Sequence, residues 1–182
     1  MKTNLALPAL LLFGLLSCNN KSQTPEQAPT IASPVLAGQS AVHDDESQKN
    51  VVQIAMASPD HKTLVAALQA VGYVDALSNA GPFTVFAPND AAFAKLPDGT
   101  VEELIKPANK LKLQDILEYH VYVGVIRENM IRGNMTLNQV NGKNVTVAKN
   151  GHGIEVNGAK VLAVVPTSNG IVYVIDTVLL PQ

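Results

Sequence analysis

Apolar and polar residues follow two different periods along this chain. In its middle part, apolar residues recur every three or four positions, which is the spacing of one helix face. This spacing predicts helices over 51–56, 64–71, 74–77 and 113–120. Gly72 directly follows the second of these, and glycine readily takes the left-handed conformation that ends a helix. The middle of the chain is therefore predicted to be helical.

In the last third, β-branched residues alternate with polar ones or form short apolar runs, which is typical of strands. The predicted strands are 144–148, 154–156, 161–165 and 171–175. Asn-Gly pairs stand at the ends of these strands, at 141–142, 150–151, 157–158 and 169–170. Asn-Gly favours the two-residue type I′ hairpin turn, so antiparallel strands of a sandwich are expected. Helices first and strands last predict an α+β wedge.

One earlier stretch, 81–93, predicts a strand that turns directly into a short helix. Its two alternating faces are Phe83, Val85 and Ala87, and Thr84 and Phe86. Pro88 ends the strand because it has no N–H for the ladder, and Asn89 or Asp90 is expected to cap the helix that carries Phe93. With three of the four Phe residues of the chain, this stretch is predicted to be a core nucleus.

Thr100 and Glu103 have the spacing of a capping box, which predicts a further helix start. Glu102 and Glu103 would suggest acid/base chemistry if they flanked one bond. Neighbouring residues of a helix point about 100° apart, so this pair is interpreted as a helix start and not as a catalytic pair.

The N-terminus has the pattern of a secreted lipoprotein. After Lys2, the apolar run 5–16 is shorter than the roughly 20 residues that span a bilayer, but it suits a signal peptide. Leu15-Leu16-Ser17-Cys18 looks like a bacterial lipobox, which predicts a signal peptide over 1–17 and a lipid on Cys18. The alternative is an ordinary signal peptide with a chance cysteine. Residues 18–49 are rich in Pro, Ser and Gln and predict a disordered tether before one domain over 50–182.

Composition and charge exclude several classes of function. The formal net charge is −2, so no basic field exists to attract nucleic acid. A single Cys excludes a disulfide framework and a Cys-based metal cluster. The histidines at 43, 61, 120 and 152 form no metal-ligand spacing, and no nucleophile elbow or phosphate loop is present. We therefore expect no enzyme, no metal and no cofactor.

Three separated segments resemble the signatures of the fasciclin (FAS1) family. They are Thr84–Phe93, Ile116–Val121 and Ser168–Pro181, and their order and spacing agree across the whole of 50–182. The resemblance implies the fasciclin fold, an antiparallel wedge of about seven strands with short helices packed against it. Structural roles are expected for Thr84, Phe86, Pro88, Phe93, Asn169, Gly170 and Asp176. Asp176 follows four apolar residues, so we expect it to be half-buried and to accept backbone or Thr hydrogen bonds.

The resemblance also draws attention to Tyr119 and His120. They match a Tyr-His pair that is tied to integrin binding in animal matrix members of the family, but the acid of a second motif is missing here, where the chain reads Val164-Val165-Pro166. A structural pair, with a half-buried His whose ring is satisfied by backbone, is the simpler interpretation. Many family members have His where this chain has Tyr173, and a tyrosine cannot act as a base near neutral pH.

Two hypotheses of function follow. The first is a monomeric adhesion module, anchored by its lipid in a bacterial envelope, which binds a protein or polysaccharide. An outer membrane facing the periplasm is the preferred location, with the cell surface as the alternative. The second hypothesis is a carrier with an apolar cleft between helices and sheet that holds a pigment or lipid-like molecule.

Overall fold

A sheet of seven strands runs through the part of the chain that the computed structural model describes, residues 48–181. The expected signal peptide, the lipid on Cys18 and nearly all of the expected tether lie outside these residues. The sheet has the order β2-β1-β7-β6-β5-β4-β3. The strands are β1 (Phe83–Pro88), β2 (Val121–Val123), β3 (Asn134–Asn138), β4 (Asn144–Asn150), β5 (Gly153–Val156), β6 (Ala159–Thr167) and β7 (Gly170–Ile175).

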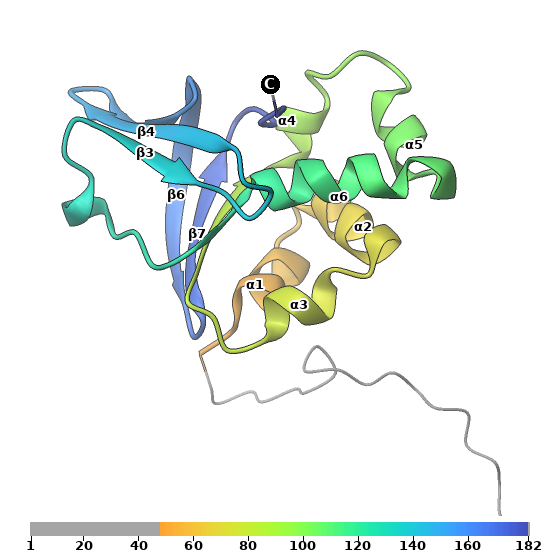
Figure 1. Cartoon of the computed structure of the whole chain (residues 1–182), viewed down its shortest axis with the longest axis horizontal. Helices are drawn as coiled ribbons and strands as arrows, with labels where there is room; N and C mark the ends of the chain where they lie inside the picture. Colours follow the sequence, from red (N-terminus) through yellow and green to blue (C-terminus); the bar gives the residue numbers. More distant parts are fainter. Residues whose placement is uncertain (1–47, 182) are drawn as a thin grey trace, which may run out of the picture. The chain divides into compact units, whose positions relative to one another are not determined.

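The helices gather on one side of the sheet (Figure 1). They are α1 (Val51–Ala57), α2 (Lys62–Val71), α3 (Val74–Ser78), α4 (Asp90–Phe93), α5 (Thr100–Ile105) and α6 (Lys110–Tyr119). Two short 3₁₀ helices, η2 (Pro107–Asn109) and η3 (Glu128–Met130), complete the described elements. The α+β fold is confirmed, and so are the helices around 51–56, 64–71 and 113–120.

The centre of the sheet differs from a fully antiparallel one. β1 pairs with β2 in antiparallel and with β7 in parallel orientation, whereas all the other pairs are antiparallel. The parallel contact requires glycine at position 170, because a Cβ there would lie 2.0 Å from the Phe83 carbonyl oxygen. At the other end of the sheet, the Val140 N–H donates to the Val121 carbonyl at 2.9 Å. This bond ties the two sheet margins together, so the sheet nearly closes into a barrel.

Each face of β1 contributes to a separate hydrophobic cluster, as the alternation in 83–87 predicts. The helix-side cluster contains Val85 and Ala87 together with residues of α1, α2 and α6. The barrel-side cluster contains Phe86 and packs it against residues of β3 to β7. Pro88 is fully buried and still pairs with Ile175 in the last register position of β1. Phe93 is half-buried against the helix-side cluster.

The structure confirms one of the two helix caps predicted from the sequence and contradicts the other. The Asn89 side chain accepts from the Ala92 N–H at 2.8 Å, so the predicted cap is confirmed. The capping box predicted at Thr100 is wrong, because Gly99, with a φ of 81°, holds the N-cap position. A capping box forms instead at Asn50 and Gln53, ahead of α1. This places the cap at the point where the described chain enters the domain.

The N-terminus of α2 is not capped by a residue of its own segment. His61 holds the N-cap position but makes no capping bond. The Asp90 carboxylate accepts from the Thr63 N–H at 2.9 Å and from the Lys62 N–H at 3.4 Å, so the cap comes from α4. A carboxylate at a helix start is favourable because the free amides there carry partial positive charge. Long-range packing therefore supplies what the local sequence does not.

Only one of the four Asn-Gly turns has the predicted type I′ backbone. Asn157 and Gly158 have φ values of 47° and 83°, and a type I′ turn needs positive φ at both central residues. At 141–142 the φ is positive at Gly142 alone, and neither residue of 150–151 or 169–170 has a positive φ. The Asn-Gly signal located the turns but not their type.

Candidate functional site

Tyr119 and His120 lie at the end of α6, where the helix runs into β2. Although the two residues are neighbours in the chain, they serve opposite faces of the sheet. Tyr119 belongs to the barrel-side cluster, and its hydroxyl donates to the Asn144 carbonyl at 2.9 Å and accepts from the Asn157 amide at 3.0 Å. His120 faces the helix-side residues around Val51 and Leu117. Each side chain is 3% exposed.

Both ring nitrogens of His120 are occupied by backbone groups. Nδ1 lies 2.7 Å from the Ile116 carbonyl, and Nε2 accepts from the Leu179 N–H at 3.0 Å. These partners require the neutral ring with its proton on Nδ1. Burial lowers the pKa of His120 to about 4, although the bond to Ile116 acts in the opposite direction. The backbone partners expected for this ring are present, and the ring is fully rather than half buried.

This burial bears on the interaction role that the resemblance suggests for the pair. A direct contact with a partner needs exposed atoms, and neither side chain offers them in this structure. Tyr119 fixes the β3–β4 and β5–β6 hairpins to the helix, and His120 fixes the tail at Leu179. The geometry therefore gives the pair a structural role.

Thr84 and Tyr173 also have their polar atoms bound to backbone, and both hold the irregular segment between β2 and η3. The Thr84 hydroxyl donates to the Gly124 carbonyl at 2.7 Å and accepts from the Ile126 N–H at 3.0 Å. The Tyr173 hydroxyl donates to the Ile126 carbonyl at 2.7 Å. Burial, with a smaller contribution from the Glu128 carboxylate, raises the pKa of Tyr173 to about 12. Tyr173 is thus a neutral hydrogen-bond donor, and its ring packs against that of Phe86 with the two ring centroids 5.9 Å apart.

Asn169 connects the β6–β7 turn to the helices. Its Oδ1 accepts from the Val51 N–H at 2.9 Å, and its Nδ2 donates to the Leu77 and Asn79 carbonyls at 2.8 Å each. Three segments that are far apart in the sequence meet at this one amide. The side chain therefore acts as a structural junction, as expected.

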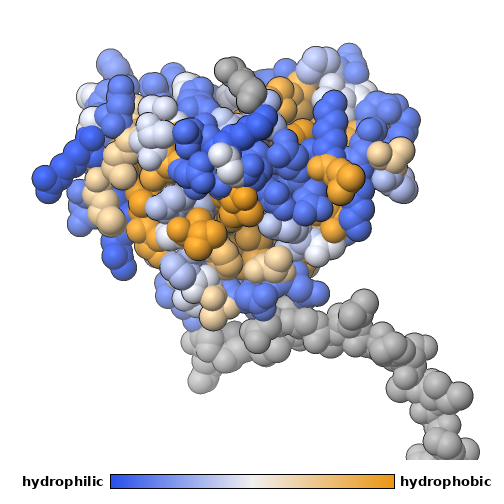
Figure 2. All heavy atoms as spheres, in the orientation of Figure 1, coloured by the Kyte–Doolittle hydropathy of each residue, from blue (hydrophilic) through white to orange (hydrophobic). Residues whose placement is uncertain are grey.

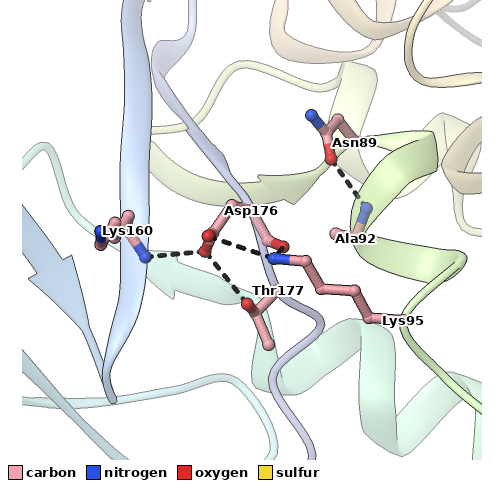
Figure 3. A network of polar contacts seen from close by, with 6 residues as sticks. All are labelled: Asn89, Ala92, Lys95, Lys160, Asp176 and Thr177. Atoms are coloured by element: carbon pink, nitrogen blue, oxygen red, sulfur yellow. Dashed lines mark hydrogen bonds and ion pairs between the residues drawn. The ribbon is translucent and has the colours of Figure 1, made fainter.

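Asp176 closes the other end of β7 (Figure 3). Its Oδ1 accepts from the Lys160 N–H at 2.9 Å and from the Thr177 hydroxyl at 3.0 Å, and its Oδ2 lies 3.2 Å from Lys95 Nζ. The Asp176 side chain is 28% exposed, so the half-buried position and the hydrogen bonds expected for it are confirmed. Burial acts to raise the pKa of Asp176, but the bonds from Lys160, Lys95 and Thr177 outweigh it and lower that pKa. The ion pair with Lys95 has no signal in the local sequence.

Ser58 and His61 are the two described side chains that come nearest to a nucleophile and its base. Ser58 Oγ lies 2.7 Å from His61 Nδ1, but His61 is 6% exposed. Its Nε2 is buried and makes no hydrogen bond to a described residue. Burial lowers the pKa of His61, against the Asp60 and Asp90 carboxylates. In residues 48–181, no group of His, Cys, Asp and Glu is arranged to hold a metal ion.

Two spaces differ sharply in size. The space between helices and sheet, where a carrier would hold its ligand, is about 20 Å³ and is lined by residues such as Leu68, Leu117 and Val172. Small-molecule sites commonly measure roughly 300 Å³ or more, so this space is a packing gap. An open groove of about 740 Å³ lies instead between the segment 125–129 and the β6–β7 hairpin. Sequence reasoning missed this groove because segments that are far apart in the chain, such as 125–129 and 164–171, line it together.

The groove has both apolar and polar lining. Its apolar residues include Val125, Val164 and Ile171, and its polar residues include Arg127, Glu128 and Asn129 from the segment that forms one wall. On the face of the molecule seen in Figure 2, apolar side chains gather in the left and central part, and polar ones surround them. None of the helices between residues 48 and 181 has the length and apolar character needed to cross a membrane.

The sequence model of the fasciclin domain matches residues 59–181, which is more than half of the chain. The chain belongs to the fasciclin family. A fasciclin-like arrangement was expected from three segments, and the match covers all three of them. The family assignment and the fold are therefore established together.

Several relatives of this fasciclin chain are bacterial proteins. It is 43% identical over 137 residues to Protein sll1483 of Synechocystis sp., covering 75% of this chain and 76% of the relative. It is 34% identical over 194 residues to the Immunogenic protein MPB70 of Mycobacterium bovis, covering 100% and 98% of the two chains. The Cell surface glycolipoprotein MPB83 of that species is 41% identical over 141 residues, covering 74% of this chain and 62% of the relative.

A solved structure confirms the fold of the fasciclin domain. The FAS1 domain pair from the insect cell adhesion molecule fasciclin I superposes with a TM-score of 0.58 at 22% identity. The match covers 74% of this chain and 51% of that one, about what one domain of a pair would give. At this identity the similarity shows the fold alone.

Proposed function

We propose that this fasciclin chain is a non-catalytic binding module of a bacterial cell envelope, carried on a lipid at Cys18. Its binding surface is the groove beside β6, and its partner is an extended segment of another protein. The observation that carries the proposal is the open edge of β6 within this groove. Residues 159 and 160 of β6 pair with β5, whereas the described partner of 161–167 is β7 alone.

An open strand edge offers main-chain hydrogen bonds to an incoming chain. Alternate residues of an antiparallel strand direct their N–H and C=O groups away from the paired neighbour, so half of these groups along 161–167 face the groove side. Pro166 lies on this stretch, and proline within sheets is confined to edges and bulges. Strand addition to such an edge is a recurring way of binding an extended peptide.

The lining favours a protein segment over a polysaccharide. The groove residues include no aromatic side chain, and sugar-binding surfaces commonly rely on aromatic rings for stacking. Val125, Val164 and Ile171 supply apolar lining that suits alternate apolar side chains of a strand. Arg127 and Glu128 place opposite charges on one wall. A partner segment that carries both signs of charge would pair with them in one register.

The relatives support the location and the kind of activity without identifying the partner. One of them is named a cell surface glycolipoprotein, and the superposable domain pair comes from a cell adhesion molecule. A lipid on Cys18 would tether this chain to a membrane without a spanning helix. Replacement of that residue, Cys18→Ser, should move the protein from the membrane fraction to the soluble fraction. Unchanged membrane association would contradict the lipid anchor.

The groove is tested by position-dependent photo-crosslinking on intact cells. A photoreactive residue at Asn129, on the groove wall, should give an adduct with a partner protein. The same residue at Leu111, which is 82% exposed on α6 and lies away from the groove, is the matched control and should give none. The variant Pro166→Arg, at an exposed position of the groove, should abolish the adduct at unchanged melting temperature.

Three results would reject the proposal. Equal adducts from Asn129 and Leu111 would mean that no defined surface is used. An adduct that survives Pro166→Arg would place the partner outside the groove. A bound small molecule in native mass spectra of the protein, purified gently from its own envelope, would favour the carrier instead.

A further inference from the structure

We infer that Asn150, in the β4–β5 turn, is a site of spontaneous deamidation, and that the fold protects the other three Asn-Gly pairs. Asparagine is among the thermolabile residues of proteins. It is most reactive before glycine, because glycine has no Cβ to hinder approach to its backbone nitrogen. All four pairs lie within the described residues, so their side-chain environments can be compared directly.

The chemistry uses only the chain and water. The Gly151 backbone nitrogen attacks Cγ of Asn150, a C–N bond forms, and the bond from Cγ to Nδ2 breaks. Ammonia leaves with the proton of the attacking amide, and a five-membered succinimide ring remains. Water then opens the ring at either carbonyl and gives aspartate or isoaspartate. No oxidation or reduction occurs, and each turnover consumes one water and releases one ammonia.

Attack requires the Asn side chain to rotate toward the next residue, and hydrogen bonds to its amide oppose that rotation. Asn169 is held by the Val51 N–H and by the Leu77 and Asn79 carbonyls. Asn157 accepts from the Thr146 N–H at 2.8 Å and donates to the Tyr119 hydroxyl at 3.0 Å. Both amides are therefore fixed at the oxygen and at the nitrogen.

Asn141 is fixed in the same way. Its Nδ2 lies 3.0 Å from the Asp115 carboxylate, its Oδ1 accepts from the Lys143 N–H at 3.1 Å, and the attacking Gly142 N–H donates to the Gln139 carbonyl at 2.9 Å. Asn150 differs from all three. Its Oδ1 accepts from the His152 N–H at 2.9 Å, but within residues 48–181 its Nδ2 makes no hydrogen bond to the protein. Asn150 and Gly151 are both exposed.

The product changes the turn in two distinguishable ways. Aspartate adds a negative charge beside Lys149 and keeps an oxygen for the His152 N–H, so the turn is retained. Isoaspartate routes the backbone through the former side chain and lengthens it by one atom. This disturbs the pairing of Asn150 with Gly153 at the end of β4. The modified turn therefore accumulates with the age of the protein.

The test is peptide mapping by mass spectrometry of the full-length protein after incubation in mildly alkaline buffer. Each protected amide must give up at least one more hydrogen bond than Asn150, and one net hydrogen bond corresponds to a rate factor of about five to ten. We expect Asn150 to convert faster than Asn141, Asn157 and Asn169 by at least about that factor. In denaturant, all four sites should convert at similar rates.

The matched variant is Gly151→Ala. A Cβ at Gly151 would meet no atom within 4 Å, and its φ is not positive, so the fold tolerates alanine there. Conversion at Asn150 should fall several-fold while the melting temperature stays unchanged. Equal native rates at the four pairs, or an unchanged rate in Gly151→Ala, would overturn the inference.

Discussion

The two hydrophobic clusters on opposite faces of β1 differ in how they combine apolar packing with polar contacts. The fully buried members of the helix-side cluster are all aliphatic, such as Leu68 and Leu117. The barrel-side cluster buries the aromatic rings of Phe86, Tyr119 and Tyr173. The two tyrosine hydroxyls bind backbone carbonyls, and the buried Thr84 hydroxyl on the same face of β1 does so too.

The difference follows from what covers each face of the sheet. Helices satisfy most of their own backbone groups, so an aliphatic surface is sufficient beneath them. The barrel side is crossed by the irregular segment between β2 and η3 (Figure 1), whose backbone has no ladder of its own. Thr84 and Tyr173 supply the missing partners at Gly124 and Ile126. Where a core is covered by irregular chain, its side chains must provide hydrogen bonds as well as volume.

The largest effect is expected from removing volume on the helix side. Leu117→Ala deletes a side chain that is 4% exposed, next to the existing 20 Å³ gap. We expect a loss of about 2–5 kcal/mol in the free energy of unfolding, measured in urea. Hydrogen exchange in the 124–131 segment should increase only as much as the lower global stability requires, without an additional local increase. A loss below about 1 kcal/mol would show that the helix side does not depend on tight packing.

The next effect comes from removing a hydroxyl on the barrel side. Thr84→Val keeps the shape but leaves the Gly124 carbonyl and the Ile126 N–H without a partner. We expect a loss of about 2–4 kcal/mol, with faster hydrogen exchange in 124–131. The matched control is Ser78→Ala on the helix side, where the hydroxyl binds the Val74 carbonyl of its own helix. Its cost should stay below about 1 kcal/mol, and equal costs would break the comparison.

The features predicted from sequence are those that depend on near neighbours in the chain. Alternation predicted the two faces of 83–87, the cap was predicted at Asn89 or Asp90 and lies at Asn89, and Asn157-Gly158 was predicted as a hairpin turn. The hydrogen bonds of Asp176 followed from its place after an apolar run. Each of these inferences needs only a strand period or one turn of backbone.

The features that sequence missed depend on long-range contacts. Asp90 caps a helix that begins 28 residues earlier, and Lys95 meets Asp176 across 81 residues. Neither contact has a local sequence signal, because an Asp or a Lys at either position would be equally compatible with an exposed side chain that makes no contact. The groove beside β6 and the parallel contact of β1 with β7 likewise arise only when the sheet assembles. Thr100 failed for another reason, since Gly99 starts the helix one residue earlier than the capping box requires.

A pH-dependent effect tests the role of His120, whose ring binds the backbone N–H of Leu179 on the helix side. The folded pKa of His120 is about 4, below its ordinary value of 6.5, so the unfolded chain binds the proton more readily. The contribution of the neutral His120 ring to the free energy of unfolding is therefore fully present above pH 6.5, and it is lost as the pH drops toward 4. The part lost through His120 amounts to about 3 kcal/mol.

His120→Gln separates this contribution from other titrating groups. Glutamine keeps an acceptor for the Leu179 N–H but cannot be protonated, so the loss of stability between pH 6.5 and pH 4 should become smaller. His61 also has a lowered pKa from burial and should account for part of what remains. An unchanged pH dependence of urea unfolding in His120→Gln would show that His120 is protonated in the folded state without cost.

The smallest effects are expected at the end of β7, where the two clusters meet solvent. Asp176→Ala leaves the Lys160 N–H without its acceptor and should cost about 1–2 kcal/mol. Lys95→Met removes the ion pair, whose partners are 53% and 28% exposed, and the exposed hydrogen bond from Lys95 Nζ to the Asp176 carbonyl at 2.6 Å; it should cost less than about 1 kcal/mol. A double-mutant cycle in the thermal unfolding of the four forms separates the two contributions. Because the backbone bond persists without Lys95, the coupling energy should be smaller than the cost of Asp176→Ala. A coupling as large as that cost would mean that the lysine, rather than the strand, positions the carboxylate.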